Sequence, residues 1–130
     1  MALTDINAEA VVIEYVRDAL ADATPVKQKV PAKRPKHWVQ IVRTGGTVLH
    51  RVVDRAQLTV TAWDEDDEVE AERLANRCRE ALLAATRVRP GKPRITKVEV
   101  LGYYYDPDPD SNAQRYTFTV IASVRASNRT

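Results

Sequence analysis

The sequence predicts an α+β fold: a mixed, mainly antiparallel sheet of four or five strands with two helices on one face, in the order α-β-β-β-α-β-β. Three observations lead to this fold class. Residues 8–21 and 64–85 repeat apolar residues at helical spacing. Shorter segments between and after them have the composition or the alternation of half-buried strands. The length of 130 residues is close to the commonest domain size, so we expect residues 1–130 to form a single domain.

The first predicted helix spans Ala8–Ala21. Asn7 or Asp5 can accept hydrogen bonds from its free N–H groups, and Glu9 complements the helix dipole in the first turn. Thr24-Pro25 ends the helix, because proline disfavours helical geometry in the residue before it. The apolar stripe of this helix consists of Ala8, Val12, Tyr15, Val16, Ala19 and Leu20.

The next part of the chain predicts three strands, namely Val26–Val30, Trp38–Arg43 and Ala56–Trp63. The third alternates cleanly between apolar and polar residues and is expected to run antiparallel to the second. Between these two, Gly45 and Gly46 tolerate positive φ, and paired glycines are rare inside a strand ladder. We therefore expect Thr44–Val53 to be a long loop that could reach a partner.

The second half of the chain predicts a helix and two strands. The acids of Asp64–Asp67 can cap a helix start, and the helix then runs to about Ala85. A strand over Ile95–Leu101 continues into three tyrosines at 103–105. Asp106–Asp110 is an acidic, proline-containing loop, and Gln114–Val124 is a long last strand.

Charge is segregated along the chain, although the formal net charge is only +2. Residues 24–55 hold eight basic side chains and one acid, Asp54; the basic ones are Lys27, Lys29, Lys33, Arg34, Lys36, Arg43, Arg51 and Arg55. Residues 64–80 reverse this balance with eight acids: Asp64, Glu65, Asp66, Asp67, Glu68, Glu70, Glu72 and Glu80. Such patches suit contact with neighbouring proteins of opposite charge. The alternative is that they are simply solvated faces.

No residue pattern predicts an active site. Cys78 lies on the apolar stripe of the second helix, where a thiol is expected to be buried and inert. His37 and His50 have no ligand spacing to each other or to the cysteine, so we expect no zinc site. The acids at 64–67 could hold magnesium, yet helix capping accounts for them without a metal. The sequence predicts neither an enzyme nor a cofactor.

The acidic loop imitates a calcium site only in part. Asp106, Asp108 and Asp110 reproduce the first three ligand spacings of a calcium-binding loop. Ser111 stands where that loop needs glycine, and Thr117 stands where it needs a bidentate glutamate. We therefore expect an exposed acidic loop and no metal.

The sequence gives little support for a nucleic-acid or membrane partner. The basic stretch near Trp38 and the tyrosines at 103–105 could contact phosphates and stack on bases. The acidic helix would repel DNA, however, and no nucleic-acid-binding motif is present. No apolar run is long enough to span a bilayer, and the first residues lack the features of a signal peptide. With one cysteine, Cys78, the chain is expected to fold in a reducing cytoplasm.

Several local strings, taken in their order, resemble the tail terminator proteins of long-tailed (siphovirus-type) bacteriophages, most of all those of phages that infect actinobacteria. The resemblance covers nearly the whole chain. The strings are Val16-Arg-Asp-Ala-Leu20, His37-Trp-Val-Gln-Ile-Val-Arg-Thr-Gly-Gly46, Val53-Asp-Arg-Ala-Gln-Leu-Thr-Val-Thr-Ala-Trp-Asp64, Glu70-Ala-Glu-Arg-Leu-Ala-Asn-Arg-Cys-Arg-Glu-Ala-Leu-Leu83, Asp106-Pro-Asp-Pro-Asp110 and Gln114-Arg-Tyr-Thr-Phe-Thr-Val120.

The resemblance implies a virion protein, made in the host cytoplasm, that forms a ring, commonly a hexamer, on the last ring of the tail tube. Such a ring stops tube polymerisation and offers a surface to the head connector, and DNA could pass through its lumen. The family has no catalytic residues. A neck or head-closure protein of the same virion and a small nucleic-acid-binding module are the alternative interpretations.

A ring needs two different complementary patches on each subunit. We expect acids from the start of the second helix or from the acidic loop to meet basic residues of a neighbour. The candidate interface residues are Lys33, Arg34, Lys36, Arg43, Gly45, Gly46, Asp64, Asp66, Asp67, Asp106, Asp108 and Asp110.

Overall fold

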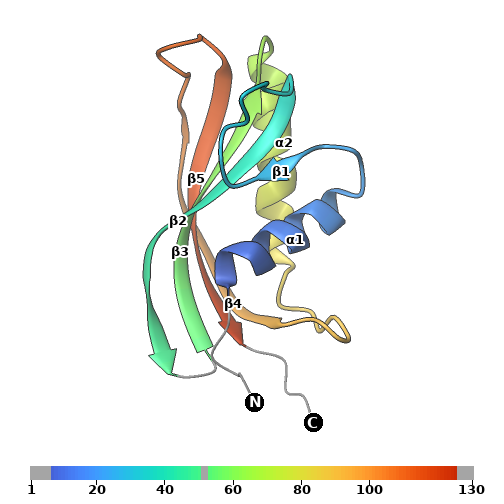
Figure 1. The fold of residues 1–130 in the computed structure, drawn as a ribbon, viewed down its shortest axis with the longest axis vertical. Coiled ribbons are helices and arrows are strands. Elements are labelled where there is room, and N and C mark those ends of the chain that lie inside the picture. The colour runs from blue at the N-terminus through green and yellow to red at the C-terminus, as the bar shows by residue number, and fades with distance from the viewer. Residues whose placement is uncertain (1–6, 51–52, 126–130) are drawn as a thin grey trace.

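The computed structural model describes residues 7–50 and 53–125, and for residues 48–50 it describes the backbone alone. Two helices pack on one face of a five-stranded sheet, which is the predicted fold class and element order (Figure 1). The elements are α1 (Ala8–Leu20), β1 (Val26–Lys27), β2 (His37–His50), β3 (Val53–Asp64), α2 (Glu68–Leu83), β4 (Arg94–Tyr105) and β5 (Gln114–Arg125).

The sheet has the strand order β1-β2-β3-β5-β4. β1 runs parallel to β2, and every other neighbouring pair is antiparallel. β3 is therefore the middle strand and β5 lies between it and β4, which forms one edge; β1 with the outer side of β2 forms the other edge. The predicted antiparallel pairing of the second and third strands is confirmed.

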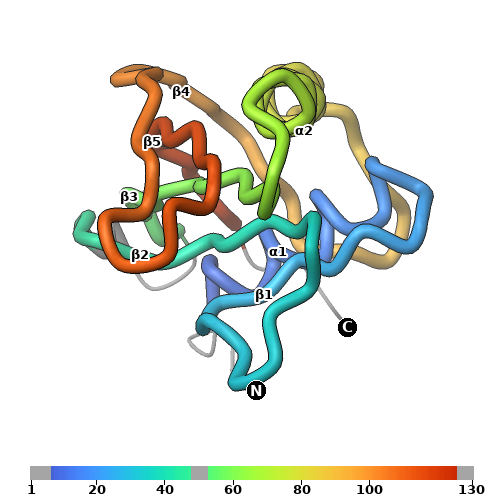
Figure 2. The backbone as a smooth tube through the Cα atoms, turned by 90° about the horizontal axis from the view of Figure 1, so that it is seen from above, coloured from blue at the N-terminus to red at the C-terminus, as the bar shows by residue number. Residues whose placement is uncertain are grey.

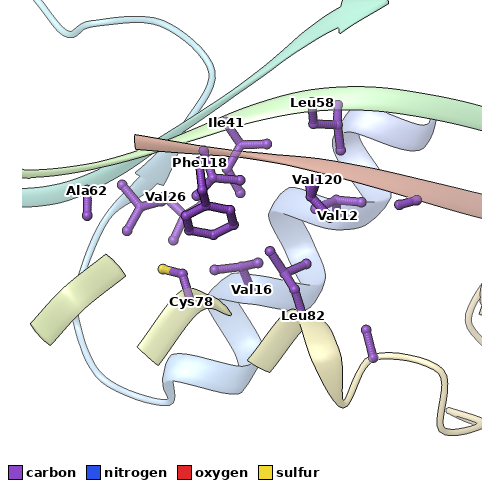
Figure 3. Packing of buried hydrophobic residues seen from close by; sticks show 14 of the residues in the cluster. Val12, Val16, Val26, Ile41, Leu58, Ala62, Cys78, Leu82, Phe118 and Val120 are labelled. Atoms are coloured by element: carbon purple, nitrogen blue, oxygen red, sulfur yellow. The ribbon is translucent and has the colours of Figure 1, made fainter. Parts of the chain in front are cut away.

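The core lies between the helices and one face of the sheet (Figure 3). Val12 and Val16 from α1 and Cys78 and Leu82 from α2 point at Phe118 and its neighbours in the sheet (Figure 3). The alternation of β3 produces this face, because its even-numbered residues Ala56, Leu58, Val60 and Ala62 are fully buried. Burying a side chain the size of Leu58 or Val60 stabilises the fold by roughly 1.5–3 kcal/mol.

Both helices begin at the caps that their residue types predict. The side chain of Asn7 accepts a hydrogen bond from the Ala10 N–H at 3.0 Å, while Asp5 lies outside the described residues. Asp67 caps α2 by accepting from the N–H groups of Val69 and Glu70. Residues 64–67 are therefore the turn before α2, which starts at Glu68.

The expectation of a long loop at Thr44–Val53 is wrong for the residues that the structure describes. Residues 44–50 continue β2, which pairs with β3 as far as His50 and Val53. The glycines accommodate an irregularity in this ladder, where the register shifts between Arg43 and Gly45. Gly46 has φ +106, and a Cβ there would lie 2.2 Å from the Arg55 carbonyl oxygen. The glycine pair thus permits close backbone approach within a hairpin.

The first predicted strand, Val26–Val30, is shorter than expected. Only Val26 and Lys27 pair with β2, and Val26 is buried. The chain then leaves the sheet, and the carbonyl of Gln28 accepts from the side chain of Gln40 instead of from the backbone. Val30 is consequently 46% exposed.

Candidate subunit interface

The turn before α2 is held together by its own acids. Asp64 accepts hydrogen bonds from the N–H groups of Asp66 at 3.1 Å and Asp67 at 2.9 Å, and its other oxygen lies 2.9 Å from Nδ1 of His37. Burial opposes ionisation of Asp64, but these hydrogen bonds outweigh it, so its pKa lies below the usual value. Asp66 pairs with Lys36 at 3.5 Å, and both side chains are largely exposed.

Two of the three acids of the acidic loop 106–113 form ion pairs within the chain. Asp106 lies 3.2 Å from Arg115, and Asp108 lies 3.4 Å from Arg34. Asp108 is only 8% exposed, and hydrogen bonds from Ser111 and from the Asp110 N–H help to hold its pKa below the usual value. The expectation of a wholly exposed acidic loop is wrong for Asp108, because a basic partner buries it.

An aromatic cluster fixes this loop to the end of the sheet, on the face away from the helices. Trp38 and Trp63 stack with ring centroids 5.2 Å apart, and Ala113 of the loop is buried with them. The guanidinium groups of Arg34 and Arg115 lie 5.1 Å and 4.8 Å from the Trp63 ring centroid. In the view from above, the loop between β4 and β5 comes close to β2 at this end (Figure 2). The loop is therefore anchored to the sheet.

Arg43 is fixed in the middle of β2 by contacts with two other elements. Its guanidinium forms a bidentate ion pair with Asp54 of β3, and the Asp54 side chain is only 6% exposed. The Arg43 N–H also donates to the carboxylate of Glu9 at 2.7 Å, which joins α1 to β2. The hydrogen bonds that the Arg43 guanidinium donates to Asp54 raise the pKa of Arg43.

The candidate charges thus divide into two groups. Arg34, Lys36 and Arg43 already have acidic partners in their own chain. Lys33 and Asp110 are exposed, and neither forms an ion pair with any residue that the structure describes. Gly45 and Gly46 lie within β2, as described above. The structure brings the acidic turn 64–67 together with Lys36, but it does so within one subunit.

β4 carries exposed apolar residues that are not among the interface residues predicted from the sequence. Leu101, Tyr104 and Tyr105 of β4 are 47%, 53% and 43% exposed. Leu101 and Tyr104 lie opposite Thr119 and Thr117, on the face away from the helices. The run of three tyrosines was the available signal, but only the sheet order shows that β4 is an edge strand.

The described residues offer little for catalysis or metal binding. No group of three or more His, Cys, Asp or Glu side chains among them could hold a metal ion. Cys78 is fully buried, and burial raises the pKa of its thiol to about 12. A hollow on the open sheet face, lined by Gly46, Thr47, Arg55, Gln57 and Ile121, contains no acid–base pair. None of the helices in the described part of the chain is both long and apolar enough for a membrane span.

Comparison with solved structures finds a counterpart for this fold. The chain is similar to a chain in a structure described as the virion of a native gene transfer agent (GTA) particle, with a TM-score of 0.68 and 18% sequence identity. The likeness covers 92% of this chain and 95% of that chain, so the two share their whole architecture. No protein-family model matches the sequence. No curated protein matches it either.

Proposed function

We propose that this protein is a structural component of a virion and that it acts as a tail terminator. It would form a ring on the end of the tail tube, in the hexameric form that the sequence resemblance implies. The observation that carries the proposal is the fold shared with a virion chain over nearly the full length of both proteins. The sequence resemblance to tail terminators supplies the particular role, and the head-proximal end of the tail is then the expected place.

The geometry supports an assembly role more than a chemical one. Three apolar residues of β4, namely Leu101, Tyr104 and Tyr105, are exposed on an edge strand, where they can contact another protein. The acidic loop is anchored by Arg34 and Arg115, which pair with Asp108 and Asp106 and lie over the Trp63 ring. A rigid, charged end of the molecule suits a fixed contact between subunits or with the tube.

The proposed interface is narrower than the sequence alone indicates. Lys33 and Asp110 keep their charges available, because they form no ion pair with a described residue. The exposed pair of Lys36 and Asp66 can exchange partners at little cost, since exposed ion pairs contribute about 0–1 kcal/mol. Arg43 belongs to the fold of the subunit itself, because Asp54 and Glu9 hold it.

The test is electron microscopy of the full chain, alone and mixed with assembling tail tubes of the parent virion. A terminator is expected to give tubes of uniform length with a ring of density on one end. Tubes of unaffected length would contradict the proposal. A ring found on the isolated head connector, and not on tubes, would assign the protein to the neck.

A second arm tests the acidic turn. Reversing the charges in the double variant Asp66→Lys, Asp67→Lys is expected to weaken the ring at moderate salt. Asp67 also caps α2, so the single variant Asp66→Lys serves as the control that leaves the cap in place. An unchanged oligomer mass in both variants would remove the acidic turn from the interface.

A further inference from the structure

The sheet has two different uncovered edges. On one side, no strand in the described part of the chain pairs with the outer side of β4. On the other side, β1 covers β2 only at Val39 and Gln40, and the Glu9 carboxylate takes the N–H of Arg43. Beyond Arg43, the outer side of β2 has no strand partner among the described residues. Unpaired edges are sites for strand addition.

The β4 edge has only part of the usual protection of an edge strand, namely two register shifts in its ladder with β5 and a few charged side chains. Residues 94–105 contain no proline, and the second half of the strand exposes Leu101, Tyr104 and Tyr105. Charged side chains are confined to its first half, at Arg94, Lys97 and Glu99. Aromatic residues that combine exposed apolar area with few rotatable bonds are typical of protein interfaces.

The registers show which parts of the two edges are level with each other. Following the paired residues across the sheet, Gly45 of β2 is level with Gln57, Ile121 and Glu99 of β4. In the same way, Val39 is level with Tyr105. The first half of β4 is thus level with the uncovered part of β2, and its tyrosine end is level with β1.

The strand directions permit the two edges to join in a ring. β4 runs opposite to β2, because three antiparallel steps separate them. A rotation about an axis roughly along the strands preserves the direction of each strand. It would therefore place β4 of one copy antiparallel to β2 of the next, which is the more stable arrangement per residue. The contact is heterologous, as a closed ring requires.

Charge complementarity favours the same arrangement. The basic segment 27–33 begins with the last residue of β1 and carries Lys27, Lys29 and Lys33, all exposed and none in an ion pair with a described residue. Beside the tyrosine end of β4 lie Glu68, which accepts from the hydroxyl of Tyr116, and Glu72, whose charge acts on Tyr103. The exposed Val30 lies in the basic segment and can pack on the tyrosines.

We propose that copies of this chain join edge to edge, with the first half of β4 pairing with residues 44–50 of β2 in the next copy. The tyrosine end of β4 then packs on the basic segment 27–33 of that copy. This inference rests on the ring proposed above and assigns its subunit contact.

The first experiment is cross-linking of the purified full chain, alone and with tail tubes, in a Cys78→Ala background. The double variant Val30→Cys, Tyr104→Cys is treated with a short bismaleimide. A ladder of covalent oligomers that ends at the ring size is expected, while each single cysteine variant gives no ladder. Dimers from Tyr104→Cys alone would indicate a two-fold contact between β4 strands and would overturn the proposal.

The second experiment places charge on the edge. The double variant Leu101→Lys, Tyr104→Lys is expected to weaken self-association by about tenfold or more, because it removes apolar contact area and places positive charge against the basic segment 27–33 of the next copy. Leu83→Lys is the matched control, since Leu83 is 56% exposed but lies on α2. Circular dichroism checks that the variants fold, and light scattering measures oligomer mass.

The outcomes separate this inference from the terminator function. Intact rings on tubes in the Leu101→Lys, Tyr104→Lys variant, together with no cross-linked ladder, would overturn the edge contact and leave the terminator function standing. A cross-linked ladder with no effect on tube length would support the edge contact and contradict the terminator function.

Discussion

Arg43 shows how a single residue, through its side chain and its backbone N–H, joins three segments of this protein. Its guanidinium binds Asp54 of β3, its N–H donates to Glu9 of α1, and its Nε donates to the carbonyl of Gly45 at 3.0 Å. Asp54 is 4% exposed, so the hydrogen bonds from Arg43 take the place of water around its carboxylate. A residue proposed from the sequence as an interface cation is therefore part of the fold itself.

We predict that Asp54→Ala lowers the free energy of unfolding by about 3 kcal/mol, because it leaves a partly buried guanidinium unpaired. Urea unfolding followed by tryptophan fluorescence measures this loss. Glu99→Ala is the control, since Glu99 forms an exposed pair with Arg55 at 3.7 Å and its loss is expected to cost about 0.5 kcal/mol or less. Equal losses in the two variants would contradict this role of Arg43.

The β2–β3 hairpin is the element on which sequence and structure differ most. Two neighbouring glycines predict a loop, yet both lie inside a strand that continues to His50. They have different roles. A Cβ on Gly45 would find only ordinary contact, 4.0 Å from Cβ of Gln57, whereas one on Gly46 would collide with the backbone of β3. The positive φ of Gly46 adds a conformation that other residues rarely adopt.

We predict that Gly46→Ala destabilises the protein by about 2 kcal/mol or more, because it combines backbone strain with a steric clash. Gly45→Ala is the matched control and is expected to be nearly neutral or slightly stabilising. Thermal unfolding of the two variants compares them directly. If Gly45→Ala were the more damaging change, the close approach of β2 to β3 at Gly46 would not be the constraint.

For the whole molecule, its two faces differ in character. One face of the sheet is covered by α1 and α2, and it holds the main core. The opposite face is covered only at one end, where the 106–113 loop and Arg34 pack on Trp38 and Trp63. Several carboxylates in and around these parts have depressed pKa values, which makes the stability of the whole molecule depend on pH.

We predict a loss of stability in acid. Hydrogen bonds and nearby cations lower the pKa values of Asp64, Asp108, Asp22 and Glu14 in the folded protein. A depressed pKa contributes stability above the unfolded value of 3.8 for aspartate, and this contribution disappears as the pH falls through the folded value. Urea unfolding at about pH 7 and about pH 3 is expected to show a clear decrease.

The variant Asp108→Asn localises part of this effect. It is expected to be less stable than the wild type near neutral pH, but to lose less stability on acidification, because it has no carboxylate to protonate. Asp18→Asn is the control, since the Asp18 side chain is 59% exposed and its arginine partner is 3.9 Å away. An unchanged pH dependence in Asp108→Asn would show that the hydrogen-bonded carboxylate of Asp108 does not contribute to acid stability.

The local pattern of the sequence determined the fold class, the element order and most of the buried face. Spacing alone placed Val12 and Val16 on the inner side of α1, and alternation placed Leu58 and Val60 on the inner side of β3. These features depend on neighbours within a few residues. For the same reason, the cap at Asp67 and the burial of Cys78 were predictable.

Only the tertiary structure decided which charges and which strands remain available for a partner. Arg34 meets Asp108 across 74 positions of the chain, and no local pattern reports such a contact. The strand order likewise depends on how distant segments pair, and it makes β4 an edge while β5 lies between β3 and β4. Charge and hydrophobicity are properties of residues, but their exposure depends on packing between segments far apart in the sequence.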